Sequence, residues 1–195
     1  MLFPTLDFAV FFLVVFALAW ALRRMASVRK LFLLAASYFF YGYWDWRFCF
    51  LLLGASLVAW AAGLTLGRSN GDRAQRAIVA VSVGLLLVIL GVFKYYGFFL
   101  ESLGDLLTGA GIERDLPLMA VILPVGISFF SFQAISYIVD VYRREIAPAR
   151  SPLDLLLYVS FFPQLVAGPI VRAADFMPQL AERPRLTRFM LAYGL

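Results

Sequence analysis

Five uninterrupted apolar stretches constrain this chain more than any other feature of its sequence. They occupy residues 8–22, 31–46, 48–66, 78–100 and 118–140. A helix needs about 20 mostly apolar residues to cross the hydrocarbon core of a bilayer, and it satisfies its backbone polar groups internally. The sequence therefore predicts an all-α fold, a polytopic transmembrane helical bundle, with residues 1–195 forming a single membrane-embedded domain.

The composition of the chain supports this membrane setting. Hydrophobic residues make up 63% of the chain and charged residues 15%, whereas soluble domains carry about 45–50% apolar and about 25% charged residues. The net charge of +5 comes mainly from arginines scattered between the apolar stretches, so we expect the lipid bilayer as partner and no nucleic acid. A single cysteine and no histidine exclude an intrachain disulfide and the commonest metal ligand, and we expect no metal and no bound cofactor.

A sixth apolar stretch, residues 153–171, is interrupted by Pro163, Gly168 and Pro169. Proline lacks an amide donor and breaks a helix, so nearby backbone carbonyls lose their helical partners. Inside a bilayer, such irregular backbone is tolerated only where protein buries it or where it lines water. We therefore expect this stretch to be re-entrant, dipping into the membrane and returning to the side from which it came.

The charges between the apolar stretches predict the orientation of the chain. Lysine and arginine collect in cytoplasmic loops, and segments 23–30, 67–77 and 143–150 are basic, whereas segment 101–115 is acidic. This pattern places the N-terminus outside, which is the periplasm for a multi-pass protein of a bacterial inner (plasma) membrane. Aromatic rings favour the headgroup level, and four of them mark the external turn between the second and third stretches: Tyr41, Tyr43, Trp44 and Trp46.

Polar residues within the apolar stretches are candidates for function, because a charge there costs about 2.5–3.5 kcal/mol on insertion scales. Lys94 lies near the external end of its stretch and either snorkels to the interface or takes part in binding or gating. Gln133 and Asp140 share one helix face and either line a hydrated cavity or join helices through polar contacts. Gln164 and Arg172 lie on either side of the Gly168-Pro169 break, which is either a kink or a loop suited to an anionic or carbonyl-bearing ligand.

Several longer motifs carry a family likeness. They lie at residues 41–47, 93–96, 123–133, 136–143 and 158–170, and include Phe93-Lys94-Tyr95-Tyr96 and Phe162-Pro163-Gln164-Leu165-Val166-Ala167-Gly168-Pro169. In this order and spacing they resemble the alginate O-acetyltransferase branch of the membrane-bound O-acyltransferase family. The resemblance covers nearly the whole chain but only the N-terminal portion of a complete member.

The resemblance implies transfer of an acetyl or similar acyl group to hydroxyls of an exported polysaccharide such as alginate. The donor would be acetyl-CoA or a similar cytoplasmic thioester, and periplasmic polysaccharide-modifying proteins would assist. Because donor and acceptor lie on opposite sides of the membrane, such an enzyme needs a tunnel. Seven residues are expected to line it: Gln164, Gly168, Pro169 and Arg172 at the cytoplasmic mouth, Gln133 and Asp140 in the cavity, and Lys94 nearer its outer end.

One feature departs from the family pattern. The essential histidine of the family, which has the acid–base role expected for activating an acceptor hydroxyl, would lie beyond Leu195, and this chain has no histidine. We therefore expect a fragment, a truncated gene or a degenerate copy that is inert alone and needs a missing C-terminal half or a separate chain.

Three other functions are alternatives. A non-catalytic membrane scaffold subunit fits the lack of histidine, and a teichoic-acid D-alanyl transferase shares the broken segment. A secondary transporter would also use broken helices, but it predicts an inverted internal repeat that the sequence does not show.

Overall fold

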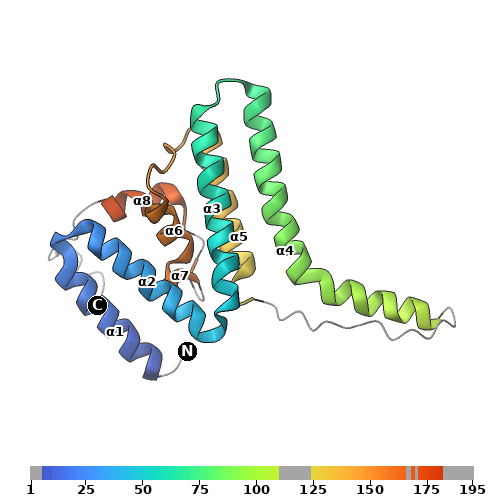
Figure 1. The fold of residues 1–195 in the computed structure, drawn as a ribbon, viewed down its shortest axis with the longest axis horizontal. Helices are drawn as coiled ribbons and strands as arrows, with labels where there is room; N and C mark the ends of the chain where they lie inside the picture. Colours follow the sequence, from blue (N-terminus) through green and yellow to red (C-terminus); the bar gives the residue numbers. More distant parts are fainter. Residues whose placement is uncertain (1–5, 110–123, 166–167, 170, 182–195) are drawn as a thin grey trace.

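The computed structural model describes residues 6–109, 124–165, 168–169 and 171–181, and in these ranges the regular structure is helical, which confirms the all-α fold (Figure 1). The helices are α1 (Leu6–Ala21), continued by a short 3-10 turn η1 (Leu22–Arg24), α2 (Ala26–Asp45), α3 (Arg47–Arg68), α4 (Asp72–Gly109), α5 (Ile127–Tyr142), α6 (Pro152–Ser160), α7 (Phe162–Leu165) and α8 (Ala173–Ala181).

Helices α3 and α5 form the centre of the molecule, and α4 packs against both (Figure 1). The buried face of α3 is built largely from small residues, Ala55, Ala59, Ala62 and Gly63. Small residues let helix backbones approach closely, which is the usual packing mode between helices in membranes. The larger side chains of this interface come from α5, where Phe130 and Tyr137 are fully buried.

Helix α6 packs against α2 and α3. An ion pair joins the first turn of α6 to α2, with Lys30 Nζ lying 2.6 Å from Asp154 Oδ1. Helix α8 is tied to α2 as well, because Arg29 donates a hydrogen bond to the Leu180 carbonyl at 3.4 Å. Two of the basic residues that we assigned to the loop at 23–30 therefore make specific contacts between helices.

Within the described residues, three helical segments are long and apolar enough to cross a membrane: Leu6–Arg24, Arg47–Arg68 and Asp72–Tyr96. These segments indicate a membrane protein. Helix α2 is not among them, and it carries Arg29, Lys30 and Asp45 besides several hydroxyl groups. Helix α5 is apolar but has only 16 residues. Membrane depth and orientation stay predictions.

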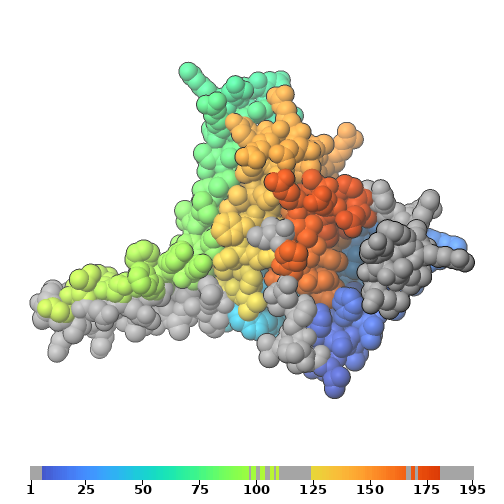
Figure 2. Space-filling view, turned by 180° about the vertical axis from the view of Figure 1, so that it is seen from behind, coloured from blue at the N-terminus to red at the C-terminus, as the bar shows by residue number. Residues whose placement is uncertain are grey.

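The fourth predicted stretch is longer in the structure than the sequence indicated. We expected a crossing at 78–100 followed by a polar connection at 101–115, but α4 continues to Gly109. The continuation bends away from the bundle as a projecting arm (Figures 1 and 2). A helix tolerates acidic side chains on one face, and leucines at 103, 106 and 107 continue the helical spacing. The acidic residues 113 and 115 lie outside the described residues.

The fifth predicted stretch begins later than expected. Residues 118–123 lie outside the described residues, and α5 starts only at Ile127. Pro124 and the left-handed backbone of Gly126, with φ 74°, separate α5 from what precedes it. The prediction of one helix over 118–140 was therefore wrong for residues 124–126, the first residues of this stretch that the structure describes.

Three of the four residues of the expected aromatic belt are exposed, and their place at the membrane interface stays a prediction. Tyr43, Trp44 and Trp46 are exposed around the turn between α2 and α3. Tyr41, however, is buried, and its hydroxyl donates a hydrogen bond to the Val125 carbonyl at 2.9 Å. Tyr41 therefore holds the start of α5 against α2 and does not face the surroundings.

Candidate functional site

The residue before α5, Gly126, lies against the end of α7. Gly126 adopts a left-handed conformation that side chains rarely tolerate, and a Cβ placed there would lie 2.8 Å from the Leu165 carbonyl oxygen. Glycine is required at this position both by the backbone angle and by the close approach. The residues before α5 and the end of α7 are thereby brought into direct contact.

The break between α6 and α7 is stabilised by α2. The Ser37 hydroxyl donates to the Leu33 carbonyl at 2.8 Å and accepts a hydrogen bond from the Phe162 amide at 3.3 Å. An amide at the start of α7 has no partner within its own helix, so this serine supplies one. The interruption that Pro163 predicted is therefore confirmed, and a neighbouring helix satisfies one of its backbone groups.

Gly168 and Gln164, two of the residues expected at the cytoplasmic mouth, lie against each other. The Gly168 amide donates to the Gln164 carbonyl at 3.0 Å, and a Cβ on Gly168 would lie 2.6 Å from Gln164 Cα. Any larger residue would displace the backbone at this turn. Pro169, the next residue, is exposed.

Gln133 of α5 is fully buried and reaches across to α6. Its Nε2 donates to the Tyr158 carbonyl at 3.0 Å. The Tyr158 hydroxyl in turn donates to the Val171 carbonyl at 2.8 Å. Helix α5, helix α6 and the segment that leads into α8 are therefore joined by two successive hydrogen bonds.

Asp140 and Arg172 lie near each other but in different settings. The Asp140 side chain is buried, whereas Arg172 is exposed and its Nη1 lies 3.5 Å from Glu145 Oε2. The positive charge of Arg172 acts more strongly on the Asp140 carboxyl group than that of Arg143 does. The structure thus places Arg172, which we predicted at the cytoplasmic mouth, at the edge of the site. There its guanidinium also approaches the Glu145 carboxylate.

Several buried side-chain atoms have no hydrogen-bond partner among the described residues, including four oxygens on α5, α6 and α7. The four oxygens are Gln133 Oε1, Asp140 Oδ2, Ser160 Oγ and Gln164 Oε1, and we call these four residues the buried polar set. A buried polar group without a partner costs about 1–3 kcal/mol. Such groups are typical of sites completed by water, a ligand or another part of a protein.

Lys94 stands apart from the buried polar set. It lies near the end of the apolar segment Asp72–Tyr96 of α4, and its exposed ammonium group lies 5.5 Å from the centre of the Tyr95 ring. The neighbouring Phe93 packs edge-on against Phe48 of α3. The assignment of Lys94 to the outer end of a tunnel stays a prediction.

Three residues of the site were missed from the sequence. Tyr158 and Ser160 lie inside the 158–170 motif, so the motif itself was the signal that could have found them. Ser37 gave no such signal, because an isolated serine in an apolar helix usually bonds only to its own backbone. Its role at the α7 amide depends on a contact between residues 125 positions apart.

The buried polar set offers hydrogen-bond acceptors and hydroxyl or amide donors in a low-dielectric setting. Within the described residues there is no group of three or more side chains suited to bind a metal ion. These residues can hold and orient a carbonyl-bearing or hydroxyl-bearing group.

Comparison with known proteins identifies relatives. A probable alginate O-acetylase of Pseudomonas putida is 39% identical over 175 residues, which are 85% of this chain and 36% of that protein. One from Pseudomonas aeruginosa is 36% identical over 174 residues, 85% of this chain and 33% of the relative. The chain is homologous to alginate O-acetylases. This confirms its resemblance to the alginate O-acetyltransferase branch of the membrane-bound O-acyltransferase family.

This alginate O-acetylase homologue is also related to a peptidoglycan O-acetyltransferase of Helicobacter pylori, with 32% identity over 178 residues, 79% of this chain and 33% of the relative. The homologue spans about a third of the length of the curated relatives it matches. No family model matches the chain, and no solved structure does.

Proposed function

We propose that this chain is part of a membrane-bound O-acetyltransferase that acetylates hydroxyl groups of an exported polysaccharide. The observation that carries the proposal is its 36–39% identity to alginate O-acetylases over about 85% of its length. Alginate is the favoured acceptor, because the two Pseudomonas alginate enzymes, at 36% and 39% identity, are more similar to the chain than the peptidoglycan enzyme at 32%.

The buried polar set supports a role in guiding the acyl donor or the acceptor. The donor in this proposal is acetyl-CoA or a similar thioester that approaches from the cytoplasm, and the acceptor lies in the periplasm. Buried oxygens on α5, α6 and α7 that lack a partner in the described part of the chain are suited to line a polar route through apolar helices, since lipid offers no hydrogen-bond partner. Gly168, Pro169 and Arg172 would form its cytoplasmic end.

The catalytic histidine in this proposal comes from sequence outside these 195 residues, which contain none. The chain would lie in a bacterial inner membrane with its N-terminus in the periplasm, and periplasmic polysaccharide-modifying proteins would be its partners. It follows that the chain alone does not transfer acetyl groups.

A chimera tests the proposed function. This chain would replace the matched 175-residue region in the P. putida relative, in cells that lack that protein, and the acetyl content of secreted alginate would be measured. We expect the chimera to restore acetylation and the chain alone to leave alginate unacetylated. A chimera that reaches the membrane at normal amounts but adds no acetyl would contradict the proposal.

Within an active chimera, replacing Arg172 by alanine is expected to lower acetyl transfer about tenfold, the effect of losing one charge-assisted hydrogen bond. The guanidinium lies at the edge of the site and pairs only loosely with Glu145, at 3.5 Å. Arg143→Ala is the matched control, because Arg143 also approaches Glu145, at 4.0 Å. Membrane insertion should be unchanged in both, and full activity of the Arg172 variant would remove Arg172 from the site.

A further inference from the structure

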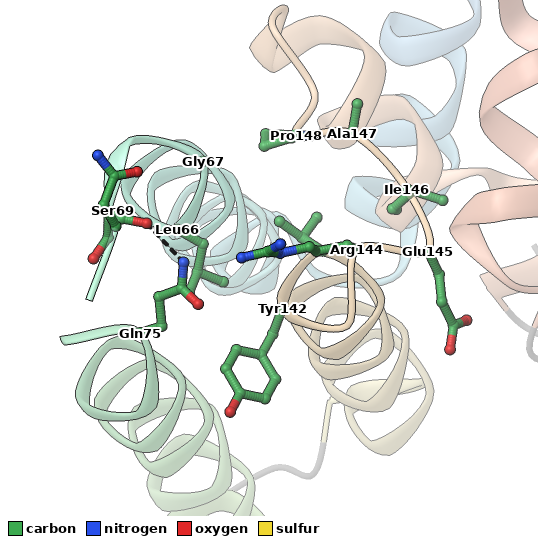
Figure 3. A pocket seen from close by; sticks show the side chains of 12 residues that line it. Leu66, Gly67, Ser69, Gln75, Tyr142, Arg144, Glu145, Ile146, Ala147 and Pro148 are labelled. Atoms are coloured by element: carbon green, nitrogen blue, oxygen red, sulfur yellow. Dashed lines mark hydrogen bonds between the residues drawn. The ribbon is translucent and has the colours of Figure 1, made fainter. Parts of the chain in front are cut away.

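A pocket of about 420 Å³ lies between the end of α3, the start of α4 and the loop that follows α5 (Figure 3). Its volume is in the range of small-ligand sites. Residues from three elements line it, among them Leu66, Ser69, Gln75, Tyr142, Arg144 and Pro148. None of these belongs to the buried polar set.

Arg144 holds a backbone conformation that favours glycine. The end of α5 is closed by two hydrogen bonds, from the Glu145 amide to the Asp140 carbonyl at 2.9 Å and from the Arg144 amide to the Val141 carbonyl at 3.0 Å. This arrangement requires a left-handed residue between helix and loop, and glycine usually occupies it. Here Arg144 occupies it with φ 62°, a backbone conformation that residues other than glycine rarely adopt.

The guanidinium of Arg144 extends between Leu66 and Gln75 (Figure 3). No acidic side chain forms an ion pair with it in the part of the chain that the structure describes. Glu145, the acid in the pocket lining, instead approaches Arg172 and Arg143. The charge of Arg144 is therefore free to meet an anion.

The walls of the pocket are held in place by specific contacts. The loop residue Ala149 accepts a hydrogen bond from Trp60 Nε1 at 3.1 Å, and its amide donates to the Tyr137 hydroxyl at 2.9 Å. Gly67 lies so close to Pro148 that a Cβ would approach Pro148 Cγ to 2.6 Å. A site whose geometry is fixed in advance loses less entropy when it binds a ligand.

We propose that this pocket binds a phosphate group, supplied by the headgroup of an anionic phospholipid. A guanidinium matches the geometry of phosphate and binds it through paired hydrogen bonds. Further along α4, Val81 and Val88 are exposed, which suits contact with acyl chains. Segments 67–77 and 143–150 around the pocket are basic, and basic pockets beside membrane helices on the cytoplasmic side recognise anionic headgroups.

Native mass spectrometry of the 195-residue chain in a neutral detergent tests this site, with phosphatidylglycerol titrated against phosphatidylcholine. We expect preferential binding of phosphatidylglycerol, weakened about tenfold in Arg144→Gly by the loss of the charge-assisted contact. Glycine suits the left-handed backbone, so this variant should fold. Arg143→Gly is the matched control, since it removes the same charge one residue away and is expected to bind normally.

Inorganic phosphate at millimolar concentration distinguishes the two sources of the phosphate group. If it does not displace the lipid, the headgroup as a whole is recognised; if it does, the phosphate alone suffices, and both results support the site when they depend on Arg144. Equal binding of both lipids, or equal weakening by both variants, would overturn the proposal. The site does not depend on the proposed acetyl transfer.

Discussion

Replacing Phe162 by alanine is expected to destabilise the chain by about 3 kcal/mol. This value is at the low end of the range for buried Phe→Ala changes, because burying a side chain within a membrane protein brings no free energy of transfer out of water. The Phe162 ring is buried and lies 5.2 to 6.4 Å, between ring centres, from four rings of α1 and α2: Phe8, Phe11, Phe12 and Phe40. Removing it would leave a cavity where α7 is anchored. Unfolding of the purified chain in detergent by increasing sodium dodecyl sulfate measures the change in free energy.

Phe132→Ala is the matched control for Phe162. This phenylalanine of α5 is 47% exposed, so its removal leaves little cavity, and we expect a change below about 1 kcal/mol. Equal destabilisation by the two substitutions would mean that the aromatic cluster does not anchor α7.

Replacing Gly63 by alanine is expected to destabilise the chain by about 2 kcal/mol, a typical effect of overpacking. A Cβ at Gly63 would collide with the Tyr137 hydroxyl and lie 2.9 Å from Cε1 of that ring. The ring has little freedom to retreat, because it is fully buried and its hydroxyl accepts the hydrogen bond from the Ala149 amide. The same detergent titration measures the loss.

Gly54 provides the control within the same helix. A Cβ added there meets nothing within 4 Å, so Gly54→Ala should be neutral or stabilise α3 by up to about 1 kcal/mol through its better helix propensity. If both alanine variants unfold alike, close packing of α3 on α5 does not determine the stability of this pair.

The fold class and most helix positions could be predicted from the sequence, because apolar runs of membrane length leave few alternatives to helices. Helix ends were less predictable. Acidic residues after Leu100 suggested a connection, yet α4 continues to Gly109, since charged side chains do not by themselves end a helix. The late start of α5 depends on Gly126, where the left-handed backbone and the nearby Leu165 carbonyl both require glycine.

The candidate site shows the same division. Gln133, Asp140 and Gln164 stand out in the sequence as polar residues in apolar surroundings, and in the structure each carries a buried oxygen that has no hydrogen-bond partner among the described residues. Their neighbours could not be predicted. The carbonyl that Gln133 meets belongs to Tyr158, and backbone carbonyls are present at every residue, so no sequence pattern singles one out.

The sequence by itself determined that this chain is an all-α membrane protein related to polysaccharide O-acetylases. It also determined that the last apolar stretch is not one continuous helix but is interrupted near Pro163. Those conclusions depend on apolar length, on proline chemistry and on ordered motifs, which are local properties of the chain. Only the tertiary structure decided that Ser37 serves the Phe162 amide and that Arg144 points into a pocket beside α3 and α4. Contacts of this kind join residues far apart in sequence, and they exist only once the helices have packed.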